Sequence, residues 1–263
     1  MFHIRKGATM DNDKILKLRD FVEDSSYIVF FGGAGVSTES GVPDFRSKDG
    51  LYNQHDVRFD MYQPEYLLSH SCLVKDPKVY FEFHRQKMDT RNIEPNPAHR
   101  YLAALEKQGK LKAVVTQNID GLHQKAGSSK VFEIHGSALR NYCPKCGKVY
   151  PEDYIFTSTE EIPHCECGGV IRPDITLYEE MLPEEAVENA IGAISKADML
   201  IIGGTSLNVY PAASYINYFK GKYLVIINRD PLYVTASGKE VLEINQNIGQ
   251  VFTALANAQG IKI

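Results

Sequence analysis

The sequence has no apolar run that approaches the roughly 18 residues of a membrane span, so we expect no transmembrane helix. It also has no block of basic residues, because 29 Lys and Arg are interspersed among 33 Asp and Glu, for a net charge of −4. We therefore expect no specific nucleic-acid partner. Residues 1–13 lack the apolar core of a signal peptide, and Met10 is an alternative natural start. These absences predict a cytoplasmic protein.

Cysteine is scarce, and four of the five cysteines are clustered. A Cys-x-x-Cys pair is followed eighteen residues later by a Cys-x-Cys pair, and a glycine that permits a tight turn follows each pair. Four thiolates suit a closed tetrahedral zinc site with a structural role; a redox disulfide and unliganded buried thiols are the alternatives. The short second spacing makes His164 an alternative ligand, and Cys72 reads as a small apolar residue. The predicted zinc ligands are Cys143, Cys146, Cys165 and Cys167.

Apolar runs typical of buried strands alternate with segments of helical spacing. A chain of 263 residues can bury a full core, so this alternation predicts an α/β fold: an open parallel sheet with helices on both faces. We expect strands at 27–31, 111–116, 131–134, 199–202 and 223–227, and helices near 15–22, 98–105, 183–196 and 248–258.

Two segments break this alternation. Residues 51–91 are rich in aromatic and charged residues with helical spacing, and residues 138–175 carry the clustered cysteines. Both read as insertions that meet in a small second domain. The polar clusters, in contrast, all directly follow predicted strands. Because the carboxyl ends of parallel strands share one edge of a sheet, these clusters predict a ligand site there.

The first predicted strand runs into the glycine-dense turn Gly32-Gly33-Ala34-Gly35. Such a turn lets main-chain N–H groups approach a diphosphate closely; the alternative is a tight turn without a ligand. The segment Pro43-Asp44-Phe45-Arg46 then combines a rigid turn, an acid, an aromatic ring and a cation, which suits a polar aromatic ligand.

With these motifs and the further ones named at the end of this paragraph, all in the same order, the chain resembles the sirtuins from about residue 12 to its end. Sirtuins are NAD-dependent protein deacylases. The resemblance implies a Rossmann-like NAD-binding domain at 12–50, 92–137 and 176–263, with a small domain made of a helical module at 51–91 and a zinc module at 138–175. The further motifs are Gly41-Val42, Thr116-Gln117-Asn118-Ile119-Asp120, His135-Gly136, Arg172-Pro173-Asp174, Gly204-Thr205-Ser206-Leu207, Val209-Tyr210-Pro211 and Ile227-Asn228.

The resemblance implies a protein-lysine deacetylase that consumes NAD and releases nicotinamide and O-acetyl-ADP-ribose. His135 fits the base that activates a ribose hydroxyl, since an imidazole titrates near neutral pH. Asn118 is the second predicted catalytic residue. The alternatives are a structural histidine and an Asx-type turn after the strand. Surface or packing roles are expected for His84, His99 and His123.

The implied cofactor site draws on every strand end. Asp120 and Ile119 would seat nicotinamide, Phe45 would cover the reacting ribose carbon, and Ile248 would contact adenine. The predicted NAD-binding residues are Ala34, Thr38, Asp44, Phe45, Arg46, Gln117, Asn118, Ile119, Asp120, His135, Gly204, Thr205, Ser206, Asn228 and Ile248.

The chain departs from the sirtuin pattern where the substrate peptide pairs. Sirtuins carry Phe-Gly-Glu there, and this chain has Leu177-Tyr178-Glu179-Glu180, so we expect an acetyl-lysine peptide to bind as an extended strand beside a segment of altered charge. Sirtuins that prefer acidic acyl groups carry a Tyr-x-x-Arg pair, which aligns here with Phe83 and Gln86. Neutral acyl groups are therefore expected, unless a one-residue helix shift brings Arg85 into the pocket.

Two other functions remain open at this stage. A mono-ADP-ribosyltransferase would use the same NAD cleavage without the acyl-transfer step, and His135 favours deacylation over it. A nonenzymatic NAD- or nucleic-acid-binding module on a zinc ribbon is the third reading, which the charge distribution and the complete predicted site disfavour.

Overall fold

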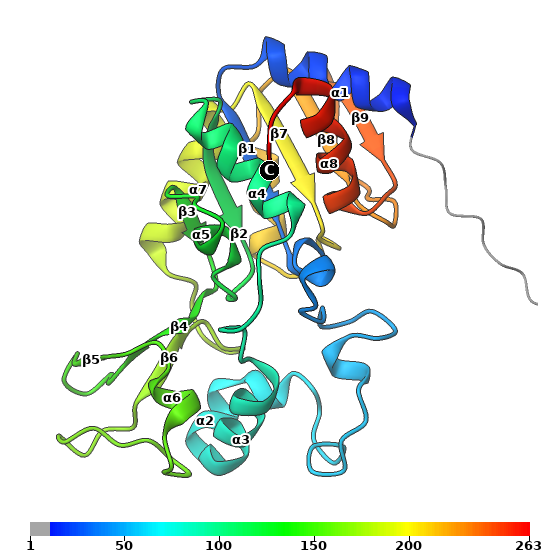
Figure 1. The fold of residues 1–263 in the computed structure, drawn as a ribbon. Coiled ribbons are helices and arrows are strands. Elements are labelled where there is room, and N and C mark those ends of the chain that lie inside the picture. Colours follow the sequence, from blue (N-terminus) through cyan, green and yellow to red (C-terminus); the bar gives the residue numbers. More distant parts are fainter. Residues whose placement is uncertain (1–10) are drawn as a thin grey trace, which may run out of the picture.

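The computed structural model describes residues 11–263, so the alternative start at Met10 lies outside the described residues. Six parallel strands form the main sheet in the order β3-β2-β1-β7-β8-β9. Figure 1 shows this sheet in the upper half of the molecule. The strands are β1 (Ile28–Gly32), β2 (Leu111–Thr116), β3 (Val131–Glu133), β7 (Met199–Gly203), β8 (Tyr223–Ile227) and β9 (Glu240–Ile244).

Helices cover both faces of this sheet, as the sequence predicts. The side chain of Phe30 packs in the core shared with α1 (Asn12–Asp24), α4 (Pro97–Lys107) and α8 (Ile248–Gln259). The neighbouring Phe31 points to the opposite core, shared with α7 (Glu184–Lys196) and the 3-10 helix η5 (Ala212–Tyr218). Successive strand residues point to opposite faces, so an apolar run without alternation is buried on both sides. The short helix α5 (Leu122–Lys125) follows β2.

One strand of the parallel sheet, β9, was not predicted from the sequence, and neither were the three strands of the smaller antiparallel sheet. Only Leu242 and Ile244 of the five residues of β9 are buried, and Glu240, Val241 and Glu243 are exposed or partly exposed. A strand at the edge of a sheet buries less apolar surface than a central one, so its hydrophobic pattern is too short to recognise.

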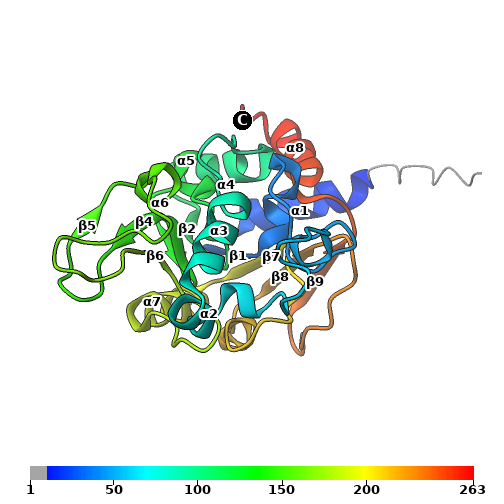
Figure 2. The same cartoon turned by 90° about the horizontal axis from the view of Figure 1, so that it is seen from below.

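A smaller body lies beyond one end of the parallel sheet (Figures 1 and 2). Its antiparallel strands pair in the order β5-β4-β6, and side chains of two modules share one apolar cluster that includes Phe81 and Ile155. The elements are β4 (Gly136–Tyr142), β5 (Val149–Tyr150), β6 (Arg172–Ile175), α6 (Tyr154–Thr157), α2 (His70–Lys75), α3 (Pro77–Lys87), and the 3-10 helices η3 (Leu51–Asn53) and η4 (Tyr66–Leu68).

Candidate functional site

A cavity of about 720 Å³ opens at the carboxyl edge of the parallel sheet. Segments that follow β1, β2, β3, β7 and β8 line it, together with the start of α8, so the polar clusters predicted to share one edge do so. The predicted NAD-binding residues on its wall are Ala34, Thr38, Asp44, Phe45, Arg46, Gln117, Asn118, His135, Gly204, Thr205, Ser206, Asn228 and Ile248.

Two glycine turns meet at the floor of this cavity. The main-chain N–H of Gly35, in η1 (Ala34–Val36), donates to the carbonyl of Gly204 at 2.8 Å. A Cβ at Gly35 would lie 2.8 Å from that oxygen, and Gly204 adopts φ +57° with its own Cβ position 2.3 Å from the nitrogen of Val36. A side chain is therefore excluded at Gly35 and at Gly204. Among the described residues, the N–H groups of Thr205 and Ser206 donate to no main-chain carbonyl, so the site can accept an anionic diphosphate.

His135 is held in one orientation at the cavity wall. Its Nδ1 lies 3.0 Å from the carbonyl oxygen of Gln117, and a carbonyl only accepts, so Nδ1 carries the proton and Nε2 is the basic nitrogen. Burial lowers the pKa of His135, and this effect outweighs the hydrogen bond to Gln117, which raises the pKa. The lowered pKa keeps the ring neutral near pH 7. The following Gly136 adopts φ +75°, and a Cβ there would lie 2.0 Å from the carbonyl oxygen of Asp174. This explains glycine after the histidine.

A buried hydrogen-bond network stands behind Asn118. The amide of Asn118 donates to the hydroxyl of Ser37 at 3.1 Å, and that hydroxyl donates to a carboxylate oxygen of Asp120 at 2.6 Å. The other carboxylate oxygen of Asp120 accepts from the N–H of Leu122 at 3.0 Å, which is the Asx-type turn. Burial raises the pKa of Asp120. Asn118 lines the cavity and Asp120 does not, so Asp120 reaches the site through Ser37.

Ile119 also lies off the cavity wall and packs against apolar clusters of the smaller body. His84, His99 and His123, for which surface or packing roles were expected, are all buried, which excludes surface positions for these three. His99 accepts from the N–H of Asn96 at 3.3 Å and lies 3.4 Å from the hydroxyl of Ser37. Neither ring nitrogen of His84 or His123 has a hydrogen-bond partner among the described residues.

Several residues on the cavity wall were not predicted from the sequence. Glu39, in η2 (Thr38–Ser40), accepts from the N–H of Gly249 at 2.6 Å and so caps the start of α8. Arg229 lies 3.9 Å from Asp44 across the cavity rim. The loop after β8 continues along the wall beyond the predicted Asn228, and its position after a strand was the available signal. The remaining wall residues outside the predicted NAD-binding set are Gly33, Gly35, Ser47, Leu207, Asn208, Val209, Tyr210, Ile227, Asp230, Pro231, Leu232, Tyr233, Gln246 and Asn247.

The segment predicted to pair with a peptide is not a regular strand. Tyr178 forms an isolated parallel bridge with Ser69, and Glu179 follows with φ +75°, a conformation that favours glycine. A carboxylate oxygen of Glu179 accepts from the N–H of Ser71 at 2.9 Å, at the start of α2. The exposed carboxylate of Glu179 is therefore engaged by a main-chain N–H of the same chain. Burial opposes ionisation of Glu180, but bonds from Arg172 and the backbone outweigh it and hold its pKa at about 2.

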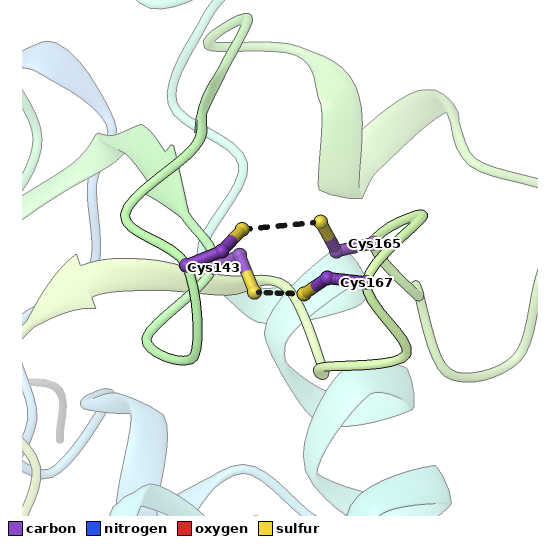
Figure 3. Close-up of side chains that lie close together, drawn as sticks. Cys143, Cys165 and Cys167 are labelled. Carbon is purple, nitrogen blue, oxygen red and sulfur yellow. Dashed lines mark hydrogen bonds between the residues drawn. The ribbon is translucent and has the colours of Figure 1, made fainter.

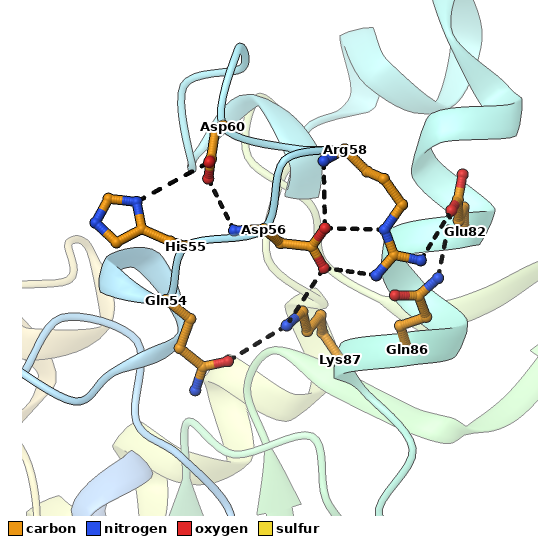
Figure 4. A network of polar contacts seen from close by, with 8 residues as sticks. All are labelled: Gln54, His55, Asp56, Arg58, Asp60, Glu82, Gln86 and Lys87. Carbon is orange, nitrogen blue, oxygen red and sulfur yellow. Dashed lines mark hydrogen bonds and ion pairs between the residues drawn. The ribbon is translucent and has the colours of Figure 1, made fainter.

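A second cavity of about 550 Å³ lies in the helical module, where Phe83 lines it beside Lys87. The neighbouring Gln86 is exposed and bonds Glu82 at 3.3 Å. Arg85 donates to main-chain oxygens of the zinc module, including that of Ile155 at 2.8 Å, and does not line the second cavity. Figure 4 shows the polar network at the rim, in which the ammonium of Lys87 lies 3.3 Å from the side-chain oxygen of Gln54 and 3.9 Å from Asp56.

The four clustered cysteines converge on one point (Figure 3). The sulfurs of Cys143 and Cys167 lie 3.5 Å apart, and those of Cys146 and Cys165 lie 3.6 Å apart. Tetrahedral zinc with bonds of about 2.3 Å places sulfurs about 3.8 Å apart, whereas a disulfide needs about 2 Å. The four thiolates therefore fit a closed zinc site. His164 is outside the cluster.

The fold and these two sites define an α/β nucleotide-binding protein with a structural zinc module. A family model described as the Sir2 family matches residues 33–211. An NAD-dependent protein deacetylase of Clostridium perfringens is 55% identical over 243 residues, which cover 91% of this chain and 97% of that relative. The chain belongs to the Sir2 family.

Solved structures agree with this assignment. Sir2 with a deacetylated p53 peptide and 3′-O-acetyl ADP-ribose superposes with a TM-score of 0.83 at 32% identity, covering 94% of this chain and 99% of that chain. Sir2 bound to an acetylated peptide gives a TM-score of 0.82 at 32% identity, covering 96% and 100%. No helix in the described part of this chain is long and apolar enough to cross a membrane.

Proposed function

We propose that this protein is an NAD-dependent protein-lysine deacetylase that consumes NAD and releases nicotinamide and O-acetyl-ADP-ribose. The observation that carries the proposal is His135, whose Nδ1 is anchored to Gln117 at the wall of the cavity that the two glycine turns also line. The deacetylase name of the Clostridium perfringens relative and the acetylated-peptide complex of Sir2 support it.

In the proposed reaction, NAD would supply the ribose that accepts the acetyl group, with nicotinamide as the leaving group. Nε2 of His135 would take the proton from a ribose hydroxyl, so that this oxygen can bond to the acyl carbon while the bond from that carbon to the lysine nitrogen breaks and one water is taken up. Because the ring is neutral near pH 7, it is ready to act as a base. Asn118 presents its amide to the ribose, and Ser37 fixes the orientation of that amide. Phe45, on the cavity wall, excludes water from the ribose carbon that loses nicotinamide.

The other predicted NAD-binding residues that line the first cavity are proposed to contact the cofactor, because of their positions on its wall. Gln117 and Thr205 bond each other at 3.2 Å, so the ends of β2 and β7 present a joined polar surface to the cofactor. Asp120 and Ile119 are proposed to support the nicotinamide end from behind Asn118. The acyl-lysine peptide is proposed to lie along residues 177–180.

The proposed domain division assigns 12–50, 92–137 and 176–263 to the NAD-binding domain, 51–91 to the helical module and 138–175 to the zinc module. Zinc would hold β4 and β6 of its module together through Cys143, Cys146, Cys165 and Cys167, and would take no part in the chemistry because all four positions are filled. We also propose that the protein works in the cytoplasm, since a four-thiolate site needs reduced cysteines.

Mass spectrometry of an acetyl-lysine peptide incubated with NAD and the protein tests this function. Deacetylation predicts loss of the acetyl group from the peptide, with formation of O-acetyl-ADP-ribose that requires NAD. ADP-ribosyl transfer would instead add mass to a protein and leave the peptide acetylated. An unchanged peptide with unconsumed NAD would contradict both activities.

A further inference from the structure

Side chains from the wall of the first cavity meet a side chain of the segment proposed to bind the peptide in one contact group. We call this group the Arg46 cluster; it is formed by Phe45, Arg46, Tyr52 and Tyr178. A guanidinium N–H of Arg46 donates to the hydroxyl of Tyr178 at 2.8 Å. The hydroxyls of Tyr52 and Tyr178 lie 3.3 Å apart, and the guanidinium sits 5.6 Å from the centroid of the Tyr52 ring. The centroids of the Phe45 and Tyr52 rings lie 5.5 Å apart.

Tyr178 is the fixed member of this cluster. Its N–H donates to the carbonyl of Leu68 at 3.0 Å, and its own carbonyl accepts from the N–H of His70 at 3.0 Å. Two residues later, Glu180 pairs with the buried Arg172 at 2.9 Å. Both ends of the segment are therefore bound to secondary structure, which fixes the main chain that carries the phenol.

Arg46 is the tethered member. It lies on an irregular loop, and the N–H of Tyr52 donates to the carbonyl of Phe45 at 2.9 Å, so these residues form one folded turn. The side chain of Arg46 is exposed and lines the cavity. Among the described residues, the hydroxyl of Tyr178 is the one hydrogen-bond acceptor recorded for its guanidinium.

The chemistry of that acceptor decides what the contact does. A phenol is uncharged, so it orders the guanidinium without neutralising it, and the other N–H groups stay available for phosphate or ribose oxygens. A carboxylate in the same place would compete with the anionic cofactor. A side chain ordered before binding also loses less conformational entropy when the ligand arrives.

We propose that the hydroxyl of Tyr178 is a positioning group for Arg46, through which the peptide-side segment sets the affinity of the cavity for NAD. This inference rests on the proposed function for the identity of the ligand. It assigns a cofactor effect to a residue on the peptide side, and sirtuins with phenylalanine at this position lack the hydroxyl.

Tyr178→Phe tests it, because the variant keeps the ring and removes only the hydroxyl. We expect the dissociation constant for NAD, measured calorimetrically on the whole protein, to rise about fivefold. The KM for NAD rises with it, and the KM for the acetyl peptide stays within about twofold. Tyr52→Phe is the matched control and is expected to change NAD affinity less than twofold. In an Arg46→Ala background, Tyr178→Phe is expected to have no further effect.

Unchanged NAD affinity in Tyr178→Phe would overturn the proposal, and so would a rise in the peptide KM alone. The same fivefold loss in the Arg46→Ala background would also overturn it, because the hydroxyl would then act without Arg46. If the wild type binds NAD but does not deacetylate, the proposed function fails, and the comparison of dissociation constants still decides this inference. If the wild type does not bind NAD, both fail.

Discussion

The imidazole of His84 stacks on the ring of Phe156, with centroids 5.2 Å apart and planes inclined by 17°. His84 belongs to α3 of the helical module and Phe156 to α6 of the zinc module, so this contact joins the two modules. His84 is fully buried, neither ring nitrogen has a partner among the described residues, and burial lowers its pKa to about 3. The interface therefore contains a histidine that must stay neutral.

That histidine makes stability dependent on pH. Because its pKa is lower in the folded state than the unfolded value near 6.5, its full contribution is present above about pH 6.5 and is lost as the pH falls towards 3. We expect His84→Phe to remove up to about 1.4 kcal/mol per pH unit from the acid slope of the unfolding free energy. Urea unfolding between pH 4.5 and 7.5 measures this, with the exposed His55→Gln as control. An unchanged slope would contradict it.

His135→Ala is expected to lower turnover of an acetyl peptide at least about 100-fold, because general-base catalysis contributes about 10²- to 10⁴-fold. Binding of NAD should change less than about threefold. In the wild type, the acid limb of kcat/KM should lie below about pH 6.5, since burial lowers the pKa of this ring. His164→Ala, outside both sites, is the control. More than a tenth of wild-type turnover in His135→Ala would rule out the role.

We expect one zinc per chain by elemental analysis of the purified protein. Cys165→Ser should lose the metal and lower the melting temperature of the protein, because metal binding supplies folding free energy to a structural site. Cys72→Ala removes the one cysteine outside the cluster and should keep a full complement of zinc. A metal-free wild type, or a Cys165→Ser protein with unchanged zinc and melting temperature, would refute the zinc site.

Acyl specificity should favour neutral groups. Phe83 packs edge to face on Phe59, with centroids 5.1 Å apart, and Arg85 is bound to the zinc module, so neither offers a charged partner to an acyl carboxylate. Burying that carboxylate unpaired costs several kcal/mol, so kcat/KM for acetyl peptides should exceed that for succinyl peptides at least about tenfold.

Lys87→Met tests whether the acyl group enters the second cavity, because Lys87 is the one cation on its wall in the described part of the chain. Its ammonium is already shared between Gln54 and Asp56, so the preference for acetyl should persist in the variant. If kcat/KM for succinyl peptides in the wild type equals or exceeds that for acetyl peptides, the expectation is wrong. In that case, loss of desuccinylation in Lys87→Met would identify Lys87 as the charge partner of the succinyl carboxylate.

Local sequence was sufficient for the central sheet and for the metal cluster. Each central strand carries its own uninterrupted apolar run, and each cysteine pair carries the glycine that closes its turn, so the signals lie within a few residues. The edge strand β9 was not predicted because only two of its five residues are buried, which leaves too short an apolar pattern. The departure at Glu179 was visible in the sequence, but the engagement of its carboxylate by Ser71 was not.

The sequence by itself determined which residue types follow each strand, and hence that a polar, glycine-rich site forms at one edge of a parallel sheet. Only the tertiary structure decided which of those groups touch. Ser37 and Asp120 are 83 residues apart and Arg46 and Tyr178 are 132 apart, and each pair shares a hydrogen bond. Contacts at such separations depend on how whole elements pack, and burial then sets the protonation of His135 and Asp120, which no local pattern of residues specifies.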